Sequence, residues 1–144
     1  MIPPDEELRR VLTTARTVAI VGLSDKPERD SHETARYLKS QGFRVVPVNP
    51  VAPAILGERS YPTLTEVPSE IRIDIVDVFR RSDQVPPIVD EAIARRVPVV
   101  WMALGVEHAG ASAKARAAGL TVYENLCIMA QHRRLGLGPV PGAR

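Results

Sequence analysis

The sequence predicts an α/β fold, a single doubly wound domain with a five-stranded, mainly parallel sheet and helices on both faces. Five runs of apolar and β-branched residues alternate with segments of helical periodicity. These runs are continuously apolar rather than alternating, which is typical of parallel strands that are buried on both faces. A length of 144 residues with 44% hydrophobic residues suits one domain. Right-handed crossovers then favour the strand order 3-2-1-4-5.

The first expected elements are a helix and a strand. Apolar residues recur at helical spacing between Leu8 and Ala15 and predict a helix over residues 5–14. A β-branched run over residues 18–23 predicts the first strand, which runs into a tight turn at Gly22. The helix and the strand together indicate that the chain enters the sheet directly after its first helix.

A second helix and strand follow. Asp30 with Glu33 three residues later resembles a capping box, and it predicts a helix over residues 30–41. The apolar run at 44–48 predicts the second strand, which Asn49 and the following proline end.

Residues 51–68 are interrupted by prolines and predict an irregular connection, with one helical turn near 64–67. The third strand is expected over residues 73–79. The helix that follows has the clearest periodicity of the chain, because apolar residues fall on one face at i, i+3, i+4, i+7 and i+8. These residues are Val85, Ile88, Val89, Ala92 and Ile93.

The last third of the chain predicts two strands and two helices. Strands are expected over residues 99–104 and 120–123, and an alanine-rich helix over 111–118 lies between them. A final helix covers residues 126–134. We therefore place the domain in residues 1–135 and expect residues 136–144, which contain several glycines and prolines, to form a flexible tail.

Composition excludes several function classes. A net charge of +2 without a long basic run argues against nucleic-acid binding. No apolar run approaches the roughly 20 residues of a membrane helix, and the acidic start of the chain has no signal-peptide core. The single cysteine, Cys127, cannot form an intramolecular disulfide. We expect a cytoplasmic protein.

The loop after the first strand is the strongest indication of a ligand site. A strand, a glycine turn and a helix start in succession present free N–H groups and a helix dipole to a phosphate. Gly22 begins the turn, Ser24 and Ser31 supply hydroxyls, and Lys26 and Arg29 supply positive charge. The G-x-G-x-x-G pattern of dinucleotide enzymes is absent, because Gly22 is the only glycine of this loop.

Four segments of the chain form a recognisable series: residues 17–29, 46–50 (Val-Pro-Val-Asn-Pro), 74–80 (Asp-Ile-Val-Asp-Val-Phe-Arg) and 100–106 (Val-Trp-Met-Ala-Leu-Gly-Val). Near the end, Cys127 is followed by His-Arg-Arg-Leu at residues 132–135. In this order the segments resemble the small CoA-binding proteins, free-standing relatives of the N-terminal domain of the succinyl-CoA synthetase α subunit. The resemblance covers about residues 5–135 and implies a Rossmann-like domain that binds coenzyme A or an acyl-CoA.

This resemblance implies that the first loop wraps the CoA phosphates and that the end of the second strand borders the adenosine. The expected contact residues are Gly22, Leu23, Ser24, Lys26, Arg29, Ser31, Val48, Asn49, Pro50, Phe79, Arg80 and Gly105. A neutral Asn49 tolerates a 3′-phosphate, whereas NAD enzymes use a carboxylate at this position. Arg80 is expected to face the ligand and Arg81 the solvent. Asp30 and Glu33 place negative charge near the phosphates and should weaken binding.

We expect a binding module that acts as a carrier, sensor or regulator rather than an enzyme, with a CoA-type small molecule as its partner and neither nucleic acid nor membrane. Cys127 is interpreted as a small buried residue rather than a nucleophile, because no histidine lies in a recognisable partner motif. His32, His108 and His132 lack metal-ligand spacing. The alternative is a small NAD(P)-dependent oxidoreductase or nucleotide sensor on the same fold.

Overall fold

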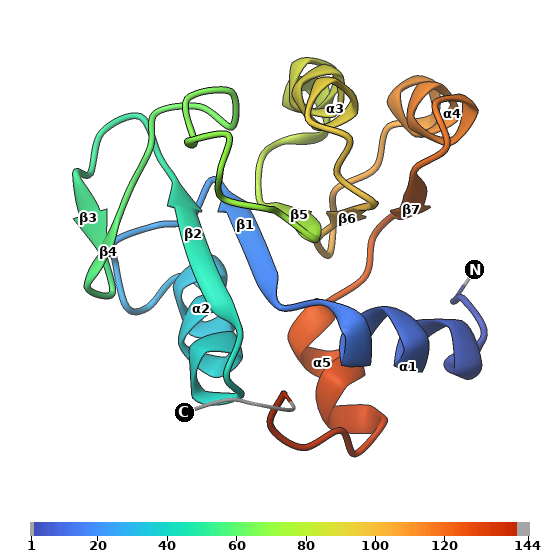
Figure 1. Cartoon of the computed structure of the whole chain (residues 1–144), viewed down its shortest axis with the longest axis horizontal. Helices are drawn as coiled ribbons and strands as arrows, with labels where there is room; N and C mark the ends of the chain where they lie inside the picture. The colour runs from blue at the N-terminus through green and yellow to red at the C-terminus, as the bar shows by residue number, and fades with distance from the viewer. Residues whose placement is uncertain (1, 141–144) are drawn as a thin grey trace.

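The computed structural model describes residues 2–140, and its centre is a five-stranded parallel sheet between two layers of helices (Figure 1). This architecture confirms the predicted α/β class. The strands of the sheet, in chain order, are β1 (Thr17–Val21), β2 (Arg44–Val48), β5 (Ile75–Val78), β6 (Val99–Met102) and β7 (Thr121–Tyr123). The helices are α1 (Asp5–Thr14), α2 (Asp30–Ser40), α3 (Val85–Ala94), α4 (Ala109–Ala117) and α5 (Ile128–Arg134), with a 3-10 turn at Ser82–Gln84.

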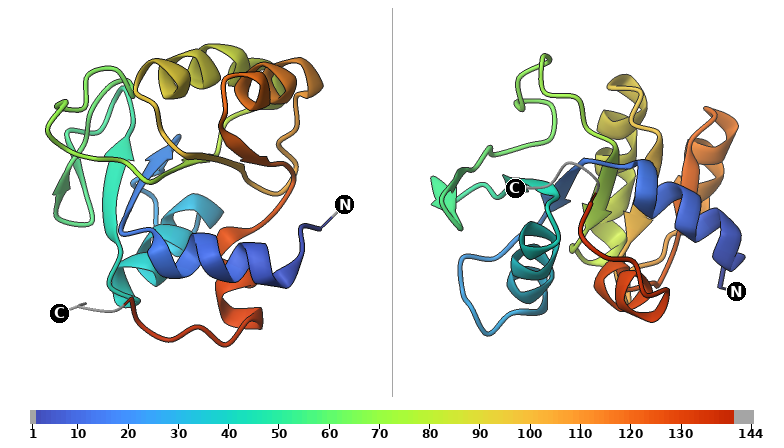
Figure 2. Two further views of the ribbon diagram at one scale, coloured as in Figure 1. Left: turned by 45° about the vertical axis from the view of Figure 1, so that its right-hand side comes forward. Right: turned by 60° about the horizontal axis from the view of Figure 1, so that its bottom comes forward.

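The helices divide between the two faces of the sheet. Helices α3 and α4 cover one face together with the irregular segment before β5, and helices α1, α2 and α5 cover the other (Figures 1 and 2). Alternate residues of a strand point to opposite faces, so Ala19 and Val21 of β1 join the first core while Val18 and Ile20 join the second. All four are buried, which is why the strands read as continuous apolar runs in the sequence.

The strand order differs from the expected 3-2-1-4-5. The observed order is β2-β1-β5-β6-β7, so β2 is an edge strand and the third strand of the sheet, β5, pairs with β1 instead. Pro47 explains the difference, because a proline in β2 has no N–H to donate and prolines are confined to edge strands. Its carbonyl oxygen faces outward and accepts the N–H of Tyr61 at 3.1 Å. The resulting order, 2-1-3-4-5 in the numbering used above, is the flavodoxin-like one.

The connection between β2 and β5 contains a hairpin that the sequence did not predict. Strands β3 (Ala54–Ile55) and β4 (Glu58–Arg59) pair antiparallel across a two-residue turn at Leu56 and Gly57. Both turn residues have positive φ, 55° and 76°, as hairpin turns of the type I′ class require. Two-residue strands are too short to show an alternating pattern, and a leucine before the glycine hides the usual turn signal.

Helix capping and one helix start differ from expectation. Helix α2 begins at Asp30 with Arg29 at its N-cap, and no side chain caps it, so the expected capping box does not form. Helix α4 begins two residues earlier than predicted because the Nδ1 atom of His108 accepts the N–H of Ala111 at 2.9 Å. Cys127 has the same role at α5, where its Sγ atom accepts the N–H of Ala130 at 3.4 Å.

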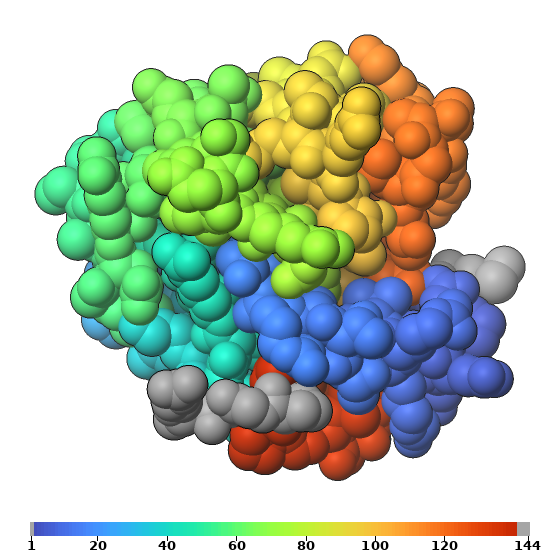
Figure 3. Space-filling view, in the orientation of Figure 1, coloured from blue at the N-terminus to red at the C-terminus, as the bar shows by residue number. Residues whose placement is uncertain are grey.

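Asp74, just before β5, holds the junction between α1 and β1. One of its carboxylate oxygens accepts the N–H groups of Arg16 at 2.9 Å and Thr17 at 3.0 Å. Figure 3 shows the blue segment, where α1 leads into β1, beside the yellow-green segment that leads to β5.

The C-terminal end of the described chain packs on the α1/α2/α5 face. Within the expected tail, Val140 is buried and donates its N–H to the carbonyl of Gln41 at 2.7 Å, while residues 141–144 lie outside the described residues. Among residues 2–140, no helix has the length and apolar character needed to cross a membrane.

Candidate functional site

The turn at Gly22 brings the end of β1 against the end of β5. Gly22 has φ +87°, and a Cβ atom built on it would lie 2.2 Å from the carbonyl oxygen of Phe79 and 2.8 Å from Cδ of Arg80. The N–H of Gly22 is donated to the carbonyl of Val48 at 2.9 Å. Glycine is therefore required here because neighbouring strand ends approach closely, and the same approach brings the loops after β1 and β5 together.

Beyond this turn, a cavity of about 420 Å³ opens between the loop and the start of α2, and we call it the loop cavity. The loop projects beyond the sheet in the right-hand view of Figure 2. Six of the twelve sequence-predicted contact residues line the loop cavity, together with Asp30. These six are Gly22, Ser24, Lys26, Arg29, Ser31 and Phe79.

The two serines of the loop cavity shape the loop as well as line it. Ser31 Oγ accepts the N–H of Ser24 at 3.0 Å, and Ser24 Oγ accepts the N–H of Lys26 at 3.0 Å. A hydroxyl that accepts a backbone N–H keeps its own hydrogen for donation. Both hydroxyls can therefore donate to an anion in the cavity, beside the exposed side chains of Lys26 and Arg29.

Asn49 connects the ends of β1 and β2 instead of lining the loop cavity. Its Nδ2 atom donates to the carbonyl of Leu23 at 2.8 Å, and its Oδ1 atom accepts the N–H groups of Val51 at 2.7 Å and Ala52 at 3.0 Å. One hydrogen of Nδ2 and the oxygen Oδ1 are used in these bonds, and the second hydrogen of Nδ2 is left for another acceptor. A carboxylate could not donate to Leu23, so the neutral amide has a structural reason in addition to the one predicted from ligand chemistry.

The remaining predicted contacts lie outside the lining of the loop cavity. Leu23 and Val48 are buried in the two cores, and Pro50 is exposed beyond β2. Gly105 donates its N–H to Oδ1 of Asn125 at 2.7 Å in the turn after β6.

Arg80 and Arg81 differ in exposure, and neither lines the loop cavity. The Cδ atom of Arg80 lies over Gly22, and the side chain is partly buried. Arg81 is 80% exposed and lies 3.5 Å from a carboxylate oxygen of Asp83.

A second cavity, of about 250 Å³, adjoins the loop cavity, and we call it the apolar cavity. Both cavities have Asp30 and Phe79 in their linings, so they lie side by side, and we call the two together the carboxyl-edge groove. Sequence reasoning missed this part of the site because its side chains come from α2, the end of β6 and the start of α5. Its other lining residues are Glu33, Thr34, Ala103, Leu104, Cys127 and Met129.

Cys127 is therefore partly exposed at this cavity rather than buried as predicted. The loop that leads from β7 into α5 carries it to the surface, where its sulfur caps the helix. Leu104, which also lines the apolar cavity, is 67% exposed. Leu104 is the last residue of the strand expected over residues 99–104, and nothing in that apolar run indicated that its side chain would project outward.

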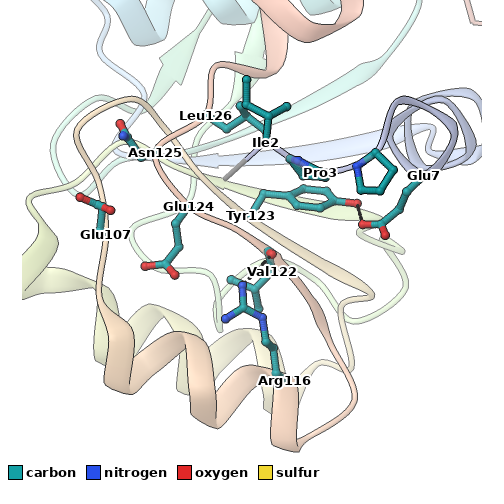
Figure 4. A pocket seen from close by; sticks show the side chains of 11 residues that line it. Ile2, Pro3, Glu7, Glu107, Arg116, Val122, Tyr123, Glu124, Asn125 and Leu126 are labelled. Atoms are coloured by element: carbon teal, nitrogen blue, oxygen red, sulfur yellow. Dashed lines mark hydrogen bonds between the residues drawn. The ribbon is translucent and has the colours of Figure 1, made fainter.

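A larger cavity, of about 580 Å³, lies elsewhere, beside β7, and we call it the edge cavity (Figure 4). The side chain of Tyr123 crosses it and donates its O–H to Glu7 at 2.6 Å, while Arg116 donates to the carbonyl of Val122 at 3.1 Å. Burial and the bond to Glu7 raise the pKa of Tyr123. With Glu107 and Glu124 also in its lining, this cavity holds three carboxylates and one cation, which disfavours a phosphate ligand.

Asp77 and His132 are buried titratable groups on the α1/α2/α5 side of the sheet. Asp77 in β5 is fully buried between Ile20 and Trp101 in the sheet register, and neither of its carboxylate oxygens has a hydrogen-bond partner among the described residues. Burial raises the pKa of Asp77 well above its ordinary value. Burial lowers the pKa of His132, whose Nδ1 atom lies 2.6 Å from the hydroxyl of Tyr37. Among residues 2–140 no group of three His, Cys, Asp or Glu side chains is arranged to hold a metal ion.

Comparison with known proteins places this geometry in a family. Residues 16–133 match the sequence pattern of the CoA binding domain. The chain is 35% identical to the uncharacterized protein YneT of Bacillus subtilis. The alignment spans 130 residues and covers 90% of this chain and 95% of that protein. A solved structure of a hypothetical protein from Pyrococcus horikoshii has a TM-score of 0.89 and 38% identity, with 92% of each chain covered.

A further similarity connects the chain to larger enzymes. The chain is 33% identical to the alpha subunit of the ADP-forming acetate–CoA ligase II of Pyrococcus furiosus over 67 residues. This alignment covers 46% of this chain and 15% of that subunit. The resemblance inferred from the sequence is confirmed. The matched pattern runs from the residue before β1 into α5 and includes the whole carboxyl-edge groove, and the chain belongs to the CoA binding domain family.

Proposed function

We propose that this protein binds coenzyme A or an acyl-CoA in the carboxyl-edge groove, as a carrier, sensor or regulatory module without catalysis of its own. The observation that carries the proposal is the loop cavity, where two serine hydroxyls and the cations of Lys26 and Arg29 surround the start of α2. Hydroxyls, cations and a helix N-terminus in one place suit a diphosphate. Family membership supports a CoA-binding role.

The order of the strands suggests how an extended ligand would lie. Along the carboxyl edge, the ends of β2, β1, β5 and β6 follow one another. We place the adenosine at the end of β2, near Asn49 and Pro50, the diphosphate in the loop cavity and the pantetheine arm toward the apolar cavity. This path matches polar protein groups to the polar part of CoA and apolar groups to its thiol end.

A role without catalysis is supported by the character of the groove. No histidine is among the described residues that line either of its cavities, so none of these lining residues is an imidazole that could act as a general base toward Cys127. The relative in Pyrococcus furiosus is named as a ligase of acetate and CoA, but this chain covers 15% of that subunit. We propose that a partner, rather than this chain, uses the bound CoA.

Calorimetric titration with CoA, acetyl-CoA, NAD and NADP tests the ligand. We expect CoA and acetyl-CoA to bind more tightly than either dinucleotide, and equal or tighter binding of NAD would contradict the proposal. The absence of catalysis is tested by incubating the protein with acetyl-CoA in the presence of a thiol-detecting dye, which reports the release of free CoA. We expect release of free CoA no faster than in buffer alone, and release that scales with protein concentration would show an enzyme.

A further inference from the structure

The apolar cavity carries an inference about the acyl group, which rests on the proposed function and deepens it. We infer that the site selects neutral short-chain acyl groups and discriminates against acyl groups that end in a carboxylate. The class of ligand is therefore an acyl-CoA such as butyryl-CoA rather than succinyl-CoA or malonyl-CoA. The argument depends on the position, the apolar lining and the charge of this cavity.

Position makes the apolar cavity the natural end of the ligand path. It adjoins the loop cavity through Asp30 and Phe79, on the side away from β2. Its volume of about 250 Å³ is below the roughly 300–1,000 Å³ of pockets that enclose a whole small ligand. A cavity of this size can take the end of a ligand whose polar part is held next to it.

The lining favours an apolar occupant. Phe79, Ala103 and Met129 present carbon and sulfur atoms to the cavity. Leu104 is 67% exposed, and it is one of three large apolar residues that are exposed among residues 2–140. An apolar acyl chain would cover Leu104 and remove its surface from water, which is favourable in proportion to the area covered.

The charge of the cavity opposes a second carboxylate. Asp30 and Glu33 both line it, no described lining residue is Lys, Arg or His, and neither carboxylate takes part in an ion pair in the described part of the chain. The cations of the groove, Lys26 and Arg29, line the loop cavity instead, where the diphosphate would neutralise them. A carboxylate on the acyl group would therefore meet two like charges without a compensating cation.

Butyryl-CoA and succinyl-CoA form a matched pair for the test, because both acyl groups have four carbons and differ by a terminal methyl against a carboxylate. Dissociation constants for CoA, butyryl-CoA and succinyl-CoA are measured by calorimetry in the presence of a reductant. We expect succinyl-CoA to bind about tenfold more weakly than butyryl-CoA, because its terminal carboxylate would lie beside Asp30 and Glu33 without a cation in the lining.

The variant Glu33→Gln removes one carboxylate from the apolar cavity and none from the loop cavity. We expect it to reduce the ratio of the two dissociation constants, and we expect Glu33→Lys to reduce it further or reverse it. Glu70→Gln is the control, because Glu70 is exposed and lines neither cavity, so the same change in net charge should leave the ratio unaltered.

The outcomes separate the two proposals. Absence of CoA binding would overturn both the proposed function and this inference. CoA binding with equal affinity for butyryl-CoA and succinyl-CoA in the wild type would overturn the inference alone. A tenfold preference that Glu33→Gln leaves unchanged would also overturn it, because the discrimination would then come from another part of the molecule.

Discussion

The edge cavity and the loop cavity differ in chemistry more than in size. The edge cavity beside β7 measures about 580 Å³ and the loop cavity about 420 Å³. The edge cavity holds three glutamates, and its tyrosine and arginine are engaged with Glu7 and with a backbone carbonyl. The loop cavity holds two cations and two hydroxyls with hydrogens left to donate. Volume alone would point to the edge cavity, whereas the available donors and charges point to the carboxyl edge.

The largest expected effect is on the turn that builds the carboxyl-edge groove. Gly22→Ala should lower the free energy of unfolding by about 3 kcal/mol or more, because its Cβ would meet the Phe79 carbonyl at 2.2 Å in addition to the strain of a positive φ. Denaturant unfolding measures the loss. Gly119→Ala is the matched control, since Gly119 has φ +92° and no atom within 4 Å, and it should lose only about 1–2 kcal/mol. Equal losses would mean that close approach of the strand ends is not what requires Gly22.

A smaller effect, on the affinity for CoA, is expected from substitution of the arginine that follows β5. Arg80→Ala should weaken CoA binding by about one to two decades, because a hydrogen bond to a charged phosphate contributes about 1.5–3 kcal/mol. Arg81→Ala should change it little, since this side chain is 80% exposed beside Asp83. Titration of both variants with CoA and dephospho-CoA also shows whether Arg80 meets the diphosphate or the 3′-phosphate. If neither variant differs from the wild type, the ligand does not reach β5.

The exposed cations of the loop should contribute less individually. Lys26→Ala and Arg29→Ala should each weaken CoA binding by about tenfold at low salt, with the difference shrinking as salt is added, because exposed charges are screened. Arg116→Ala removes the cation of the edge cavity and should leave CoA affinity unchanged. A loss of affinity in Arg116→Ala that matches the loss in Lys26→Ala would move the site to β7.

A substitution in the edge cavity should change the stability of the protein and leave its affinity for CoA unaltered. Tyr123→Phe removes the bond to Glu7 and should cost about 1–3 kcal/mol of unfolding free energy at neutral pH with no change in CoA affinity. Because the pKa of Tyr123 is raised in the folded protein, its hydroxyl holds its proton more strongly when folded than when unfolded. The stability it contributes is present below pH 10 and falls as the pH rises above 10. Chemical denaturation between pH 8 and pH 11 should therefore show the wild type losing its advantage over Tyr123→Phe.

The sequence predicted the fold class and the polar half of the groove better than the strand order or the apolar half. Continuous apolar runs and the glycine turn at Gly22 are local signals, and they identified the strands and the loop that lines the loop cavity. The strand order depended on Pro47, whose missing N–H marks an edge strand, and this signal was present in the sequence but was not used. The apolar cavity could not be predicted in this way, because Thr34, Leu104 and Cys127 meet there only through the packing of α2 and α5 on the sheet.

Backbone amide spectra recorded during a titration with CoA test the central claim most directly. Amide groups near Gly22, Ser31 and Arg80 should show the largest shifts on addition of CoA, and those of Val122 to Asn125 beside the edge cavity should remain in place. This result would locate the ligand at the carboxyl edge of the sheet independently of any mutation. Largest shifts along β7 and α1, with an unchanged loop between β1 and α2, would contradict the account.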